Sequence, residues 1–204
     1  MNQILDYIGS LIIGGIILIM IVAFNGNVLE SSGVQVFKTT VQSNLTTVTD
    51  IIETDIRKMG YRVAMPVDSA ITYADTSKII FKGDFDDNGT IDSLQYYLSS
   101  NGSSLTNNPK DSVLYRKLNN NPAQPMFVGI TKFKLRYYDR LDSLFTGNRI
   151  SNPSLIKSLK LSISIESNDR ILDSRRGEYL GNALNDTTYS GVYWERKIKP
   201  KNLR

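Results

Sequence analysis

One acidic segment of this chain, Asp84–Asp92 (DFDDNGTID), carries oxygen-bearing residues in an order that suits a metal ion. Counted from its first aspartate, side-chain oxygens stand at positions one, three, five and nine, with a glycine at position six. Position seven can offer its backbone carbonyl. Calcium loops of the D-x-D-x-N-G type use this spacing, because a hard cation prefers oxygen ligands and the glycine allows a sharp turn. The pattern predicts a Ca2+ site with five candidate ligands: Asp84, Asp86, Asn88, Thr90 and Asp92.

The same segment also fits a solvated acidic turn without metal. The twelfth position of a calcium loop normally supplies a bidentate glutamate, and here it is the neutral Gln95. Asn88-Gly89 is a strong hairpin signal, and the flanking segments resemble strands rather than the helices of an EF-hand. Both interpretations stay open. If an ion binds, we expect it to neutralise the aspartates and pin the hairpin, which is a structural role.

The composition excludes several kinds of catalytic site. The 204 residues include no cysteine and no histidine, which removes thiol nucleophiles, histidine-based triads and zinc fingers. No pair of carboxylates has a spacing that suggests acid–base catalysis. We therefore expect a protein that is not an enzyme and whose one candidate cofactor is Ca2+. The enzymatic alternative is a membrane-anchored hydrolase.

Segments on both sides of the acidic turn alternate between apolar and polar residues, which is typical of half-buried antiparallel strands. We predict a hairpin of two strands, Lys78–Gly83 and Ile91–Leu98. Further strands are expected at Val113–Leu118, Phe133–Tyr137, Leu159–Ile165 and Tyr193–Lys199. Long polar loops are expected at Ser99–Asp111, Asn119–Pro125, Asp139–Pro153 and Ser167–Val192.

The N-terminal segment Ile4–Phe24 is long and apolar enough to cross a membrane. Its 21 residues form about 30 Å of helix, which is the thickness of a hydrocarbon core. We predict a retained anchor rather than a cleaved signal peptide, because a basic leader and a small-residue cleavage site are not recognisable. Asp6 interrupts the segment. It either marks the membrane boundary or pairs with a positive group, such as the terminal amine of a neighbouring copy.

A second helical segment follows, with its apolar residues on one side. Between the two, residues 25–33 (NGNVLESSG) contain two glycines and several polar residues, so a kink or a melted segment is an alternative to a continuous helix. Gly60 stands where a helix-ending glycine is expected. Steps of three and four residues define the apolar stripe: Val34, Phe37, Val41, Leu45, Val48, Ile52, Ile56 and Met59.

These elements predict an α+β fold, in which a long N-terminal helix packs its amphipathic half on an antiparallel β-sheet domain. We divide the chain into a transmembrane helix half (1–27), an amphipathic helix half (28–60) and a β-rich domain outside the cytoplasm (61–204). The C-terminal end, Arg196–Arg204, is rich in basic residues. We expect it to be a solvated strand and tail rather than a nucleic-acid site, because no nucleic-acid-binding motif accompanies it.

The order of these features resembles that of type IV pilin-like proteins, nearest the W-type minor pilins of type IV pili and the J-type minor pseudopilins of type II secretion. The apolar helix that continues into an amphipathic one is the first shared feature. The second shared feature is the segment Ile52–Tyr61 (IETDIRKMGY), which is similar to the D-[IL]-R-x-A-G-Y motif at the end of that family's helix. The hairpin Phe81–Leu98 with its Asp/Gly turn is the third shared feature. The fourth is the pair Ile130–Asp139 (ITKFKLRYYD) and Trp194–Leu203 (WERKIKPKNL).

The resemblance implies a non-catalytic structural subunit of a pilin-like filament. It implies contacts with other pilin-like subunits through the N-terminal helix, with an assembly platform and with secreted cargo, but not with nucleic acid. It also implies a single span in the inner membrane, with the domain in the periplasm or outside the cell. The family's basic leader, glycine cleavage site and Phe-Thr-Leu-x-Glu start are not recognisable, so we expect no processing. Asp6 would then replace the glutamate that meets a neighbouring subunit's amine.

A single-span sensor and an adhesin domain are the alternatives. A membrane receptor usually returns through the membrane to a signalling domain, and no second apolar run of 18 residues follows Phe24. This disfavours the sensor. An adhesin that uses the acidic turn overlaps with the pilin-like interpretation, and the sequence does not separate the two.

Overall fold

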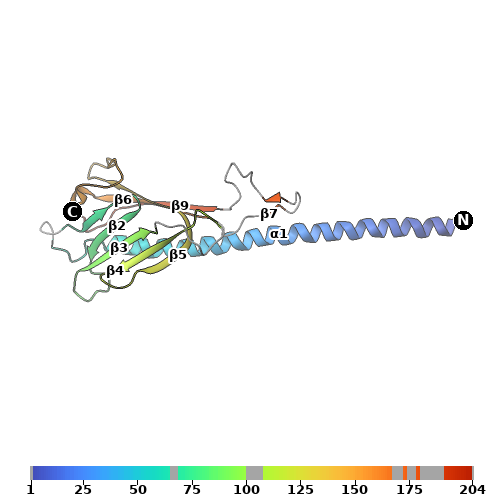
Figure 1. Ribbon diagram of the computed structural model, residues 1–204, viewed down its shortest axis with the longest axis horizontal. Helices are drawn as coiled ribbons and strands as arrows, with labels where there is room; N and C mark the ends of the chain where they lie inside the picture. Colours follow the sequence, from blue (N-terminus) through green and yellow to red (C-terminus); the bar gives the residue numbers. More distant parts are fainter. Residues whose placement is uncertain are drawn as a thin grey trace.

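The computed structural model describes residues 2–64, 69–99, 108–166, 172–173, 178–179 and 191–203. One long helix, α1 (Asn2–Lys58), spans most of the length of the molecule, and a seven-stranded sheet packs against its C-terminal half (Figure 1). Much of the N-terminal half of α1 projects away from the sheet as a single rod. This architecture confirms the predicted α+β fold with an antiparallel sheet.

The helix α1 is continuous through residues 25–33, where a kink or a melted segment was one of the expectations. The segment contains no proline, so no backbone hydrogen bond is lost there. Each of its two glycines costs about 1 kcal/mol, and helical turns on both sides offset this cost by propagation. Within α1, Asp6–Gly26 has a mean hydropathy of 2.6 and is not buried inside the described part of the protein. This segment is apolar and long enough to cross a membrane.

The sheet is antiparallel throughout and has the strand order β1-β2-β3-β4-β5-β6-β9. A short 3-10 helix, η1 (Pro153–Leu155), precedes β6, and β7 (Leu172–Asp173) pairs with β8 (Glu178–Tyr179) outside the sheet. The strands of the sheet are β1 (Ile71–Ala74), β2 (Lys78–Gly83), β3 (Asp92–Leu98), β4 (Ser112–Leu118), β5 (Gln124–Tyr138), β6 (Ser158–Glu166) and β9 (Gly191–Ile198).

The alternation of apolar and polar residues located most of these strands. β2 has the predicted bounds, and β3, β4, β6 and β9 begin within two residues of the predicted positions. β5 is longer than predicted and includes the last two residues of the expected loop Asn119–Pro125. Pro125, Gly129 (φ 94°) and the register shifts opposite β4 interrupt the alternation there. β1 was not predicted, because four residues are too few to show a period. Most of the expected loop Ser167–Val192 lies outside the described residues.

The amphipathic half of α1 buries its apolar stripe against the sheet. The stripe belongs to one cluster with strand residues such as Phe81, Leu94 and Leu161. Each fully buried large side chain contributes about 1.5–3 kcal/mol, so this contact holds helix and sheet together. The side chains of Val34 and Phe37, at the start of the predicted stripe, lie outside the described part of the protein. The buried members are Val41, Leu45, Val48, Ile52, Ile56 and Met59.

Gly60 terminates the helix in the left-handed conformation (φ 76°), as predicted. Its amide donates a hydrogen bond to the carbonyl of Lys82 at 2.8 Å, which joins the helix end to β2. The side chain of Asn202 donates to the carbonyl of Met59 at 3.3 Å. A Cβ on Gly60 would lie 3.2 Å from the Asn202 carbonyl oxygen, so the C-terminal segment also packs closely on the helix end.

Candidate functional site

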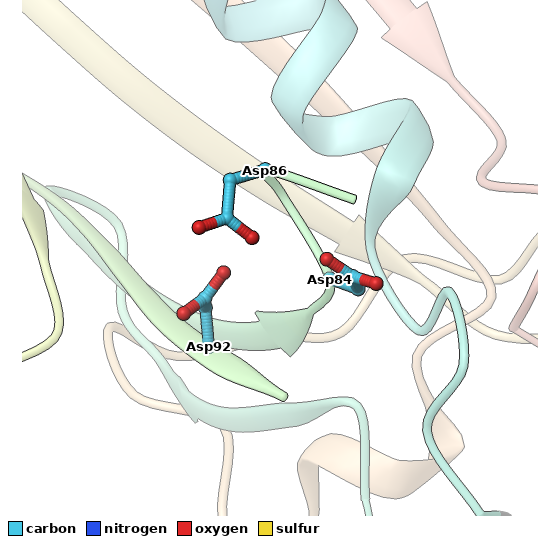
Figure 2. A group of neighbouring side chains, drawn as sticks. All are labelled: Asp84, Asp86 and Asp92. Atoms are coloured by element: carbon cyan, nitrogen blue, oxygen red, sulfur yellow. The ribbon is translucent and has the colours of Figure 1, made fainter. Parts of the chain in front are cut away.

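The acidic segment forms the turn between β2 and β3. The strands pair up to the first residue of β3, Asp92, and the chain turns through Asp87 (φ 60°) and Gly89 (φ 89°). One oxygen from each of Asp84, Asp86 and Asp92 lies within 4.8 Å of the others. Figure 2 shows the carboxylates of Asp86 and Asp92 facing each other, with one oxygen of Asp84 turned toward them. The turn therefore brings three of the five predicted ligands close to one another.

Asp84 is fully buried, with 0 % of its surface exposed, which is rare for a carboxylate. Its Oδ2 accepts hydrogen bonds from the Gly89 amide (3.0 Å) and from Arg62 Nη1 (2.6 Å). Burial raises the pKa of Asp84, but these donors outweigh burial, so the pKa lies below its usual value. The side chain is ionised at neutral pH. Its other oxygen, Oδ1, is buried and has no hydrogen-bond partner among the described residues.

The remaining predicted ligands bond to one another or to neighbouring residues. Asn88 Nδ2 donates to Asp86 Oδ2 (2.7 Å), and Asn88 Oδ1 accepts from the Thr90 amide (2.7 Å). Asp92 Oδ1 accepts from the side chain of Asn119 at 2.7 Å. The nitrogen and the oxygen of the Asn88 side-chain amide are therefore both hydrogen-bonded. Asn88 and Thr90 are exposed at the rim of the turn. The three aspartates come together, while Asn88 bonds to Asp86 through its amide nitrogen and its oxygen accepts from Thr90.

Gln95, at the twelfth position, lies inside β3, where it pairs with Ile80 of β2 and Lys117 of β4. Its backbone is committed to the sheet on both sides. The predicted hairpin is confirmed, because the acidic turn is flanked by two paired strands rather than by the helices of an EF-hand. The twelfth position therefore lies in a strand and carries a neutral side chain, unlike the glutamate of an EF-hand.

The acidic turn also forms hydrogen bonds and ion pairs with residues at the end of α1. Lys58 Nζ, in the last turn of the helix, donates to Asp87 Oδ2 (2.9 Å) and to the Phe85 carbonyl (3.1 Å). The Asp87 carboxylate raises the pKa of Lys58. Arg62 bonds to Asp84, as described above. The sequence analysis missed both cations. Their sequence signal is that two basic residues flank the helix-ending glycine and are opposite in charge to the acidic turn.

Gly83 makes this close contact between the turn and the helix end sterically possible. A Cβ at this position would lie 2.7 Å from the carbonyl oxygen of Lys58, closer than real Cβ atoms approach backbone. Only glycine lets the end of β2 run directly past the end of α1. The backbone amide of Asp84 then donates to the carbonyl of Tyr61 at 3.2 Å. The turn and the helix end therefore form one unit.

A second polar contact lies deeper between helix and sheet. Asp55 of α1 accepts hydrogen bonds on one oxygen, Oδ2, from the hydroxyl of Tyr96 on β3 and from Arg116 Nε on β4, the latter at 2.8 Å. Tyr96 is fully buried, and burial together with the Asp55 carboxylate raises its pKa. These bonds fix the rotation of α1 about its own axis relative to the two central strands. Sequence periodicity did not identify them, because a polar residue beside the stripe is indistinguishable from a solvated one.

A third polar contact ties the last strand to the helix. Glu53 accepts from Arg57 one turn later (2.6 Å) and from Arg196 of β9 (2.6 Å), so its two oxygens are both used. Both arginine side chains are about half exposed, so each pair contributes at most about 1 kcal/mol. Arg196, at the start of the basic C-terminal end, thus takes part in an ion pair with the helix.

The second candidate site is the surface of the N-terminal half of α1. Its large apolar side chains are exposed, for example Leu11 at 77 % and Ile16 at 48 %. Asp6 lies at the exposed start of this segment. Isolated soluble proteins rarely expose a continuous apolar surface of this extent, and such surfaces mark contacts with lipid or with other proteins. The segment has the properties of a membrane span or of a helix that packs among others.

Comparisons with known proteins give a likeness of fold. No protein-family model and no curated protein matches the chain. Among solved structures, the chain is similar to a type IV-like pilin from Thermus thermophilus, with a TM-score of 0.50 and 12 % sequence identity. The match covers 80 % of this chain and 98 % of that one. At this identity the likeness concerns the fold alone: the chain has a pilin-like fold.

Proposed function

We propose that the chain is a non-enzymatic structural subunit of a pilin-like filament, with the role of a minor pilin or a minor pseudopilin. The observation that carries this proposal is the exposed apolar half of α1, joined to a sheet domain in a pilin-like fold. Apolar surface is unfavourable in water at about 25 cal/mol per Å². A helix of this kind is therefore stable in a lipid bilayer or among the helices of neighbouring subunits.

In this proposal the chain has two successive environments. Before assembly, residues 1–27 span the inner membrane, and the sheet domain (61–204) lies in the periplasm or outside the cell. During assembly, the same helix half leaves the lipid and packs among the helices of other pilin-like subunits. Both environments are apolar, so the transfer exchanges one favourable contact for another. An assembly platform and secreted cargo are the further partners that fit this role.

Asp6 is the one carboxylate at the membrane end of this helix. A charge at the centre of a bilayer costs about 2.5–3.5 kcal/mol, and the cost is lower near the interface or in an ion pair. We propose that it meets a positive group of a neighbouring subunit, such as a terminal amine, during assembly. Residues 28–60 then serve as the connector, because the stripe residues from Val41 to Met59 are buried against the sheet domain of the same chain.

The proposal is tested by locating the chain in cells that make surface filaments. Filaments and membranes are purified separately, and the chain is quantified in each by mass spectrometry that also reads its N-terminus. We expect the chain in both fractions. Ile16→Lys introduces a charge into the apolar surface at about 3 kcal/mol, which lowers the filament-bound amount by about 100-fold.

Leu141→Lys is the matched control, because Leu141 is 85 % exposed on the sheet domain. We expect its filament-bound amount to equal that of the unmodified chain. Recovery of the unmodified chain in membranes alone, from cells whose filaments lack it, would contradict the proposal. It would favour a membrane-anchored sensor or adhesin instead.

A further inference from the structure

We propose that the turn between β2 and β3 binds Ca2+ through Asp84, Asp86 and Asp92, and that the ion stiffens the junction between α1 and the sheet. This inference goes beyond the proposed function, since neither membrane insertion nor filament packing requires a metal. It concerns the opposite end of the helix from the apolar surface. The two proposals can therefore fail independently.

The buried oxygen of Asp84 is the first observation that points to a ligand. Asp84 Oδ1 is enclosed and has no hydrogen-bond partner among the described residues, although its carboxylate is charged. A buried polar atom without a partner is costly, and native structures rarely tolerate one without a ligand or water. Oδ2 is already saturated by Arg62 and Gly89. A cation that contacts Oδ1 would satisfy the carboxylate without displacing either donor.

The spacing of the carboxylates suits calcium. One oxygen from each of Asp84, Asp86 and Asp92 lies within 4.8 Å of the others. Oxygens bound to one Ca2+ lie at most about 4.6–5.2 Å apart, given metal–oxygen distances of about 2.3–2.6 Å, so one ion can reach all three. Mg2+ demands shorter bonds and nearly octahedral geometry, and it gives up its waters reluctantly, so we expect it to bind this irregular turn less well.

The local charge favours a divalent ion over a monovalent one. Among the described residues, two basic side chains bond to the turn, which contains four carboxylates, so an excess of two negative charges remains within this group. Ca2+ neutralises this excess. The carboxylates are those of Asp84, Asp86, Asp87 and Asp92, and the basic groups are those of Lys58 and Arg62.

Two more ligands are available within the turn after a small local change. Rotation of the Asn88 side chain would release Asp86 Oδ2 and aim Asn88 Oδ1 at the ion, while the Asn88 backbone amide keeps its bond to Asp86 Oδ1. The Thr90 carbonyl occupies the position that supplies a backbone oxygen in calcium loops. Without a glutamate at the twelfth position, we expect an affinity in the range of extracellular calcium modules, with a Kd of about 0.1–1 mM.

The ion would act on α1 through the contacts that surround it. Asp84 holds Arg62, and its backbone amide bonds to Tyr61, while Asp87 holds Lys58. Fixing the turn therefore fixes the residues on both sides of the helix-ending glycine. In a subunit whose helix transmits force or packs in an assembly, this junction sets the angle between helix and domain.

The test uses the full chain in detergent, with calcium chloride alone as the probe. In 10 mM calcium we expect the thermal midpoint to rise by about 3–10 °C relative to the chelator-treated protein. Asp86→Asn removes one ligand at an exposed position and should abolish most of this rise. Asp50→Asn is the matched control. It makes the same chemical change at an exposed position of α1 that lies outside the turn, so we expect it to keep the rise.

Two further readouts complete the test. Calorimetry of the unmodified chain should give one site in the stated range, and 10 mM magnesium should produce less than half of the calcium effect. Calcium should also slow amide hydrogen exchange more strongly at residues 56–62 than in β9. No heat and no shift with calcium, an equal shift with magnesium, full retention of the rise in Asp86→Asn, or unchanged exchange at residues 56–62 would each overturn the proposal.

Discussion

Ile52→Asp is expected to unfold the sheet domain. Ile52 lies at the centre of the helix stripe and is 1 % exposed. The substitution removes about 2–3 kcal/mol of apolar burial and places an ionised carboxylate without a partner in the core, which costs several kcal/mol more. The sum is comparable to the whole stability of a typical domain, about 5–15 kcal/mol. Near-ultraviolet circular dichroism and protease resistance of the full chain in detergent measure the loss.

The neighbouring residue provides the matched control. Ile51 is 41 % exposed on the same turn of α1, so Ile51→Asp makes the same chemical change outside the core. We expect its midpoint of unfolding in guanidinium chloride to stay close to that of the unmodified chain, because surface substitutions usually change stability by less than about 0.5 kcal/mol. Equal tolerance of both substitutions would contradict the packing of the stripe on the sheet.

Asp55→Ala is expected to lower the free energy of unfolding by about 3–5 kcal/mol. The carboxylate accepts from both Tyr96 and Arg116, and its removal leaves a buried hydroxyl and a mostly buried guanidinium without their acceptor. Most of the expected cost is the desolvation of these two donors, which are left without an acceptor, rather than the lost attraction to the Asp55 carboxylate. Denaturant titration of the full chain in detergent, followed by circular dichroism, measures the change.

Asp50 serves as the control for Asp55. It lies on the exposed side of the same helix, so Asp50→Ala removes an equal charge without touching the sheet. Its expected change in the free energy of unfolding is below about 0.5 kcal/mol. Asp55→Asn, which keeps an oxygen acceptor, should recover part of the loss. If Asp55→Ala were as stable as Asp50→Ala, the Asp55 contact would not hold the helix to the sheet.

Periodicity explains why the fold could be predicted from the sequence. The stripe residues between Val41 and Met59 recur at the helical period, and one face of α1 is buried for that reason. β2 alternates because one of its faces meets the core and the other does not. β6 alternates in sequence as well, although Ser158 and Ser162 on its polar face are also buried. Where this two-sided environment is interrupted, as at the bulged start of β5 or in the short β1, the signal is absent and the prediction missed strand residues.

The polar contacts between elements could not be predicted, for a different reason. Asp55 and Arg116 are 61 positions apart in the chain and meet only because β3 and β4 cross the helix there. No local pattern records such a pairing. The acidic turn was identified because its candidate ligands are close in sequence, and the structure gathers three of them. Its attachment to Lys58 and Arg62 required the helix end and the hairpin to be placed together.

These contacts divide α1 into two halves with different environments. The second half is held by the stripe, by Asp55 and by the acidic turn, all within one chain. The first half has an apolar surface with no counterpart in the described part of the molecule (Figure 1). A filament subunit needs this division, because the sheet domain must stay folded while the first half of the helix changes its surroundings.

The most direct test of the central claim is a photo-crosslink from the exposed half of α1 in purified filaments. A benzoylphenylalanine at position 16 should form adducts with the N-terminal helices of pilin-like subunits, identified by mass spectrometry. The same group at position 141, on the sheet domain, should form none with those helices. Adducts from position 16 to lipid or to unrelated membrane proteins alone would contradict the account.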